Sequence, residues 1–279
     1  MSPTVRRRRL ASELRRLREA AELTCEDVAA RLECSASKIS RIETGRVLAS
    51  PRDVRDLLAI YDAPDEQRES LIQLARDARQ KGWWHDYRDS VQPHWATYLG
   101  MEGMASELRQ HSVIRIPALL QTEDYARAVI TSGRMGRSEP GADRAVELLM
   151  ERQRQASVTP PKVWAVLDEA ALRRQVGGRE IMRQQIEHLM EASSKPGMLL
   201  QFIPNASGAH PAMDLPFVIM TYADPADPEI VCVGYATGML WIEDTAEVDQ
   251  YTKLFHHLQA AALSPGDSTA LMISVLKEM

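Results

Sequence analysis

The hydrophobic positions of the first sixty residues recur at helical spacing. Three leucines share one face of a helix expected over residues 5–21, and arginines occupy the opposite face (Leu10, Leu14 and Leu17). Apolar residues at similar spacing predict a second helix that ends near Leu32 and a third that ends at Thr44. Two short helices joined by a tight turn are typical of a helix-turn-helix unit.

Residues with capping chemistry mark the ends of these helices. Thr24, with Asp27 three residues later, forms a variant of the capping box, and Ser35 has the position of the next N-cap. Gly45 stands where a left-handed C-terminal cap is expected. The segment Ser50-Pro51-Arg52-Asp53 predicts the start of a fourth helix, because it combines a cap, a proline at the first helical position and an acid at the third.

Beyond residue 60 the pattern becomes mixed. We expect further helices over residues 65–80, 103–110, 122–131, 143–157, 170–175 and 179–192, and a final amphipathic helix over residues 245–263. Short apolar runs bounded by Pro, Gly and Asp predict strands over residues 162–167, 198–203, 217–222, 230–235 and 239–242. An aromatic-rich connector is expected over residues 81–100, with packing between domains or between copies as its default role.

The predicted fold class is therefore mainly α with a smaller α+β part. A five-helix domain is expected over residues 1–80. A C-terminal α+β domain is expected over residues 101–279, because its strands gather late in the chain, with helices before and after them. Its sheet is predicted to be short-stranded and antiparallel or mixed.

Composition narrows the class of protein. The 279 residues are 44% hydrophobic and 26% charged, and no apolar run approaches the length of a membrane-spanning helix. The N-terminus has no secretory signal pattern, and three cysteines cannot form a disulfide framework (Cys25, Cys34 and Cys232). These features predict a cytoplasmic protein.

The charge is distributed unevenly along the chain. Residues 1–60 carry 13 basic and 9 acidic side chains, so the remaining 219 residues carry 21 basic and 30 acidic side chains. A basic head on an acidic body suggests that only the head meets a polyanion.

The third predicted helix presents hydrogen-bond donors on one face. Ser37, Lys38 and Arg41 share that face because they are three or four residues apart, and Thr44 extends it. These side chains can reach base edges or phosphates of DNA.

The segment LTCEDVAARLECSASKISRIETGRVLASP resembles the XRE, or lambda-repressor-like, helix-turn-helix family. The resemblance rests on the Leu-Thr start, on Val28-Ala29, and on the pattern from Ser35 through Gly45. It departs from the family at Cys25, where a glutamine is frequent, and at Glu33-Cys34, where Leu-Gly is usual.

The resemblance implies that the third helix lies in the major groove of operator DNA. Arg41 is then the best candidate for a contact with guanine, and Lys38 can contact guanine or a phosphate. Thr24 and Arg46 are expected to hold phosphates. The full set of expected DNA contacts is Thr24, Ser35, Ser37, Lys38, Arg41, Thr44 and Arg46. Arg6 to Arg9 form either an arm or a first helical turn against the DNA backbone, or a solvated helix face, and Glu43 is expected to brace the domain through an ion pair.

Four C-terminal segments carry a second resemblance, over nearly all of residues 83–279. They are IPALLQTEDYARAVI, ERQRQ, VLDEAALRRQVGGREIMRQQIEHL and ALSPGDSTALM. They resemble the domain that follows an XRE domain in WhiJ-type actinobacterial regulators. That family implies an antitoxin-like transcriptional regulator, often encoded beside a small partner protein. Ala118 replaces a usual Gly, and Val233-Gly234-Tyr235 stands where a Glu is common.

Enzyme chemistry finds little support in the sequence. The paired carboxylates Asp168 and Glu169 are expected to cap the helix that follows them, and His256-His257 point to different faces. No metalloprotease, hydrolase, P-loop or dinucleotide-binding motif is present, so we expect no enzyme, no metal and no cofactor.

The predicted function is that of a homodimeric, DNA-binding transcriptional regulator. Its expected partners are operator DNA, a second copy, and a small protein or small-molecule effector bound by the C-terminal domain, with no membrane. The alternative is an interaction protein whose main role is partner binding, with DNA contact secondary. The acidic C-terminal body favours this alternative.

Overall fold

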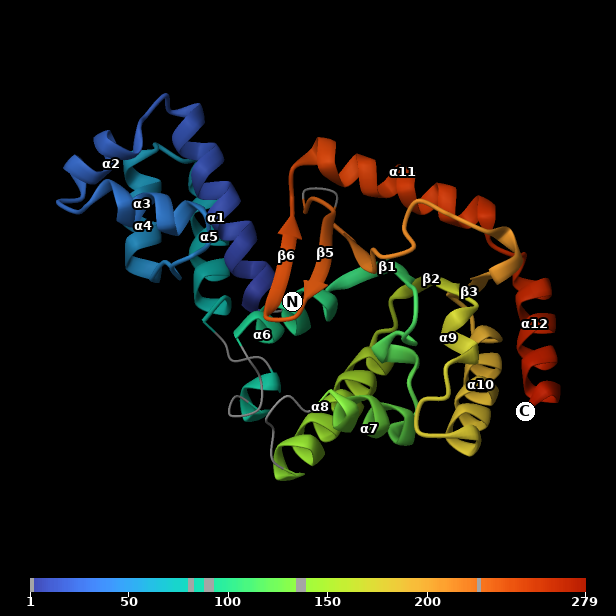
Figure 1. Ribbon diagram of the computed structural model, residues 1–279. Helices are drawn as coiled ribbons and strands as arrows, with labels where there is room; N and C mark the ends of the chain where they lie inside the picture. Colours follow the sequence, from blue (N-terminus) through green and yellow to red (C-terminus); the bar gives the residue numbers. More distant parts are fainter. Residues whose placement is uncertain (1–2, 80–82, 88–92, 134–138, 225–226) are drawn as a thin grey trace. The chain divides into compact units, whose positions relative to one another are not determined.

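The computed structural model describes residues 3–79, 83–87, 93–133, 139–224 and 227–279 (Figure 1). The chain divides into two compact units, an N-terminal unit of residues 1–86 and 96–104 and a C-terminal unit of residues 87–95 and 105–279. Within the described residues, no helix has the length and apolar character needed to cross a membrane.

The N-terminal unit is helical. Its elements are α1 (Pro3–Ala20), α2 (Cys25–Arg31), α3 (Ala36–Glu43), α4 (Pro51–Ile60), α5 (Asp65–Asp77), the 3₁₀ turn η1 (Trp83–Tyr87) and α6 (Pro93–Glu102). The last residue of η1 and the first three residues of α6 are counted with the C-terminal unit. The five predicted helices of this part are confirmed. One core cluster joins α1 to α5, and its fully buried members include Leu14, Val28, Ile39, Val54 and Leu58. Leu10, Leu14 and Leu17 all lie in this cluster, as their spacing predicts.

The predicted connector contains structure that its sequence did not reveal. Residues 93–102 form α6, in which Tyr98 is buried and donates a hydrogen bond to Glu102 Oε1 at 3.1 Å. Residues 80–82 and 88–92 of the connector lie outside the described residues.

In its described residues, the C-terminal unit is built on one mixed sheet of six strands in the order β3-β2-β1-β4-β5-β6. The strands are β1 (Ala105–Ser112), β2 (Lys162–Asp168), β3 (Met198–Ile203), β4 (Phe217–Tyr222), β5 (Ile230–Tyr235) and β6 (Gly238–Ile242). β1, β2 and β3 run parallel, and β4, β5 and β6 add antiparallel pairs. The predicted fold class is confirmed.

Helices lie on both faces of this sheet. The helical elements of the unit are η2 (Ala118–Leu120), α7 (Glu123–Ser132), α8 (Glu139–Val158), α9 (Ala170–Arg173), α10 (Arg179–Ser193), η3 (Asn205–Ser207), α11 (Thr245–Ala261) and α12 (Pro265–Glu278). Figure 1 shows α11 along one face of the sheet and α10 on the other. Val166, Ile219 and Phe255 of α11 share a core cluster, and because side chains alternate along β2, Ala165 and Leu167 are buried on the opposite face.

Two predictions about elements are wrong. Residues 103–110 were expected to be helical, but residues 105–112 form β1, the strand at the centre of the sheet. In the sheet, Arg109 pairs with Glu229 at 2.6 Å, although the local propensity of this segment favours helix. The helix predicted over residues 245–263 is not the last, because α12 follows it and buries Met272 and Val275.

Candidate nucleic-acid interface

Capping bonds fix where the helix-turn-helix begins and turns. The Thr24 hydroxyl accepts a bond from the Asp27 N–H at 3.1 Å, and the Asp27 carboxylate accepts from the Thr24 N–H at 2.9 Å. At the start of α3, the Ser35 hydroxyl accepts from the Lys38 N–H at 3.3 Å. Between the helices, Glu33 takes a left-handed conformation with φ of 51°, which is uncommon outside glycine. The predicted cap residues therefore have the roles that the sequence assigned to them.

A buried ion pair braces α3 against α1. The Arg18 Nε lies 3.0 and 2.9 Å from the two Glu43 oxygens, and the Tyr61 hydroxyl donates to Glu43 at 3.1 Å. Burial lowers the pKa of Arg18, but the hydrogen bond to Glu43 raises it, and the net shift of this pKa is upward. Burial, with the nearby Glu43 carboxylate, raises the pKa of Tyr61. Glu43 thus serves the structural role predicted for it, with Arg18 and Tyr61 as partners that the sequence did not identify.

The outer face of α3 carries the predicted DNA contacts. Arg41 is exposed, and its Nε donates to the Ser37 carbonyl at 3.1 Å, so the guanidinium lies along its own helix. Ser37 is exposed, and its hydroxyl lies 3.1 Å from the Ser35 hydroxyl. The Thr44 hydroxyl donates to the Ser40 carbonyl at 2.8 Å. Within the part of the chain that the structure describes, no carboxylate pairs with Arg41.

Arg46 and Lys38 differ in their surroundings. Arg46 is exposed just after Gly45, which has a φ of 65°, and no ion pair of the described residues includes it. The Lys38 ammonium instead lies 2.7 Å from the Asp53 carboxylate of α4. The sequence indicated Asp53 only as a capping residue, so this pairing was missed.

The N-terminal arginines belong to a helix rather than to a detached arm. They lie in α1, where each of Arg6 to Arg9 is half-buried. Arg6 donates to the Asp77 carbonyl at 3.3 Å, and Arg8 donates to the Met101 sulfur at 3.8 Å. Burial lowers the pKa of Arg7.

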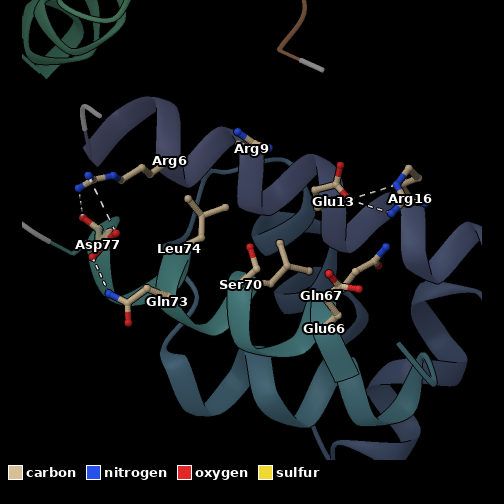
Figure 2. A pocket seen from close by; sticks show the side chains of 11 residues that line it. Arg6, Arg9, Glu13, Arg16, Glu66, Gln67, Ser70, Gln73, Leu74 and Asp77 are labelled. Atoms are coloured by element: carbon tan, nitrogen blue, oxygen red, sulfur yellow. Dashed lines mark hydrogen bonds and ion pairs between the residues drawn. The ribbon is translucent and has the colours of Figure 1, made fainter. Parts of the chain in front are cut away.

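A hollow of about 890 Å³ lies between α1 and α5 (Figure 2). Its charged lining is balanced, with Arg6, Arg9 and Arg16 against Glu13, Glu66 and Asp77. Figure 2 shows Arg6 turned toward Asp77 and Glu13 bonded to Arg16. A lining with equal numbers of acidic and basic side chains does not attract a polyanion, so the outer face of α3 is the better nucleic-acid interface.

The paired carboxylates after β2 have structural partners. Asp168 accepts from the Ala170 N–H at 2.9 Å and so caps α9, as predicted. Glu169 does not cap through its side chain; it pairs with Arg173 and accepts from the Asn205 N–H at 2.8 Å. The expectation that both carboxylates cap this helix is therefore correct only for Asp168.

Two histidines lie close to this carboxylate pair. His210 lies 3.3 Å from Asp168, and the ring nitrogens of buried His111 face the Val166 and Ala212 carbonyls at 2.9 and 3.1 Å. Burial lowers the pKa of His111 despite these two acceptors. Across the described residues, no three His, Cys, Asp or Glu side chains are grouped as metal ligands would be.

Comparison with known proteins adds two family matches. A family described as a helix-turn-helix domain matches residues 9–71, which include α2, the turn and α3. A family described as a domain of unknown function (DUF5753) matches residues 95–274, well over half of the 279 residues. No curated protein and no solved structure matches the chain.

Proposed function

The chain belongs to the DUF5753 family and carries a helix-turn-helix domain, and on this premise we propose that it is a sequence-specific transcriptional regulator. A helix-turn-helix domain indicates a DNA-binding protein.

The observation that carries the proposal is the set of donors on the exposed face of α3. In this motif the second helix enters the major groove with its N-terminal residues at the base edges. Arg41 is assigned to guanine, because its planar fork matches the O6 and N7 acceptors. Thr24 and Arg46 flank the helix and are assigned to phosphates.

The C-terminal unit is assigned to dimerisation and sensing. It has its own sheet and its own core, so it is a compact unit separate from the one that carries α3. The resemblance to WhiJ-type regulators supports an antitoxin-like role in the cytoplasm, with a small protein or a small molecule as effector and no enzymatic activity. A two-fold dimer places half-sites about 10 bp apart, or a multiple of that spacing.

A second candidate is an interaction protein that contacts DNA only secondarily. It is favoured by the acidic balance of residues 61–279, which carry 21 basic and 30 acidic side chains. Acidic surfaces repel DNA and attract basic partners.

Binding to DNA across a salt series separates the two candidates. The full chain is titrated with the duplex upstream of its own gene and with a random duplex of equal length. A regulator binds the first more tightly, and its affinity falls steeply with salt. Equal, weak binding to both duplexes would favour the interaction protein. Sedimentation of the free chain and of the complex gives the number of copies bound.

A further inference from the structure

The Asp53 carboxylate joins α4 to the exposed face of α3. Its Oδ2 accepts from the Ser50 N–H at 3.1 Å and from the Ser50 hydroxyl at 2.5 Å, which completes a capping box at the start of α4. Its Oδ1 accepts from the Lys38 ammonium at 2.7 Å. The bonds from Ser50 hold the Asp53 carboxylate in place, and the carboxylate in turn holds the Lys38 ammonium.

Two other helix N-caps among the described residues pair a hydroxyl with an aspartate but lack this second contact. Asp27 completes the box of Thr24, and Asp267 bonds to Ser264 at 2.6 Å at the start of α12. In neither case does a described ion pair link the carboxylate to a lysine. The Ser-Pro-x-Asp pattern is the same at Asp53 and Asp267, so the capping function alone does not explain the contact with Lys38.

We propose that Asp53 is a positioning residue for DNA reading, which holds Lys38 so that its ammonium reads a guanine edge rather than a phosphate. This inference rests on the proposed function. It adds a determinant of specificity that lies outside the recognition helix.

The chemistry of an ammonium supports this assignment. A lysine ammonium has three N–H donors, and Asp53 takes one, which leaves two for other acceptors. Guanine offers two adjacent acceptors in the major groove, O6 and N7. A free lysine side chain also loses rotamer entropy when it is fixed, and the contact with Asp53 meets part of that cost before DNA binds.

The pairing also changes how Lys38 responds to salt. The Asp53 hydrogen bond raises the pKa of Lys38, so the ammonium stays charged, but the adjacent carboxylate offsets that charge. A neutralised pair releases few counterions from DNA. Lys38 therefore contributes to discrimination between sequences more than to general affinity.

The test compares Asp53→Asn with Asp267→Asn in the full chain. Both variants remove one negative charge and alter one Ser-Pro-x-Asp cap, but only the first releases Lys38. The probes are a duplex selected by the wild-type chain from a randomised library and a random duplex. For Asp53→Asn we expect the affinity ratio between the two duplexes to fall about tenfold, within the range for losing one base contact. The released ammonium should steepen the salt dependence on random DNA by about one ion. Asp267→Asn should change neither quantity.

Lys38→Met provides a second variant that leaves every cap intact. It should lower the affinity ratio at least as much as Asp53→Asn. Adding Asp53→Asn to Lys38→Met should have little further effect on the ratio, because residues that act through one contact are not additive. Equal ratios for Asp53→Asn and wild type, or full additivity in the double variant, would overturn the inference. Failure of the wild-type chain to select any duplex would instead overturn the proposed function.

Discussion

Removing the Glu43 carboxylate should destabilise the N-terminal unit more than any change on the outer face of α3. The Glu43 side chain is 3% exposed and its partner Arg18 is 13% exposed. Glu43→Ala leaves the Arg18 charge inside the protein without its carboxylate, a change that costs about 3–5 kcal/mol. Arg18 keeps the bond from Nη1 to the Leu23 carbonyl at 2.7 Å, and its Nη2 lies 3.7 Å from the Glu19 carboxylate, so the lower end of the range applies. The unbonded Tyr61 hydroxyl adds about 1 kcal/mol. We therefore expect a loss of about 4 kcal/mol, a large part of the roughly 5–15 kcal/mol that stabilises a typical domain.

Hydrogen exchange followed by mass spectrometry measures this loss in the full chain. Peptides from α1 and α3 should exchange much faster in Glu43→Ala, while peptides from the sheet keep their rates. Tyr61→Phe should cost about 1 kcal/mol, since it removes one hydrogen bond. The control is Glu69→Ala, an exposed glutamate of α5, which should stay within about 0.5 kcal/mol of wild type. A cost below 1 kcal/mol for Glu43→Ala would refute the view that this ion pair braces α3.

Three further predictions concern DNA contacts and pH. Arg41→Ala should relax discrimination at one base pair by roughly 1–3 kcal/mol, and equal weakening on operator and random duplexes would contradict its assignment to guanine. Arg46→Ala should weaken binding to all duplexes alike and reduce the salt slope by about one, which a titration at several salt concentrations measures. His111 has a pKa lowered by burial from its ordinary value of 6.5, so the unfolded chain binds its proton first as the pH falls. The C-terminal unit should therefore lose stability as the pH drops below about 6.5, and His111→Gln should reduce that loss. Melting temperatures of the wild type and of His111→Gln between pH 7.5 and 5.5 test this, and an equal decrease in the two proteins would exclude the effect.

Local capping chemistry could be predicted from the sequence because each cap involves residues that are neighbours in the chain. The boxes at Thr24 and Ser50 were predicted and are present. The same reasoning would have found α12, since Ser264-Pro265 with Asp267 repeats the pattern that starts α4. That helix was missed although its signal is in the sequence.

The central strand could not be predicted in the same way. The residues of β1 include Glu107, Leu108 and Gln110, which favour helix when they are considered locally. Their conformation depends on β2 and β4, which lie on either side of β1 in the sheet. Tertiary pairing of this kind outweighs a difference of a few tenths of a kcal/mol in propensity.

The donors of the candidate interface were predictable, but their couplings were not. The spacing of Ser37, Lys38 and Arg41 requires only that α3 be a helix. The pairs Lys38–Asp53 and Arg18–Glu43 depend on how α3 packs against α4 and α1. Such distances follow from the tertiary fold rather than from the period of one helix.

The position of β1 also determines the order in which the two units can fold during synthesis. Arg109 in this strand lies beside Trp164 of β2 and Ile219 of β4, so the centre of the sheet forms only after most of the chain has left the ribosome. Among the described residues, the buried members of the core cluster of α1 to α5 run from Leu10 to Ala75. Contacts between distant segments form slowly, and N-terminal domains fold first as the chain emerges. Every newly made molecule therefore passes through a stage in which α3 is already folded and exposed while the unit assigned to sensing is not yet assembled.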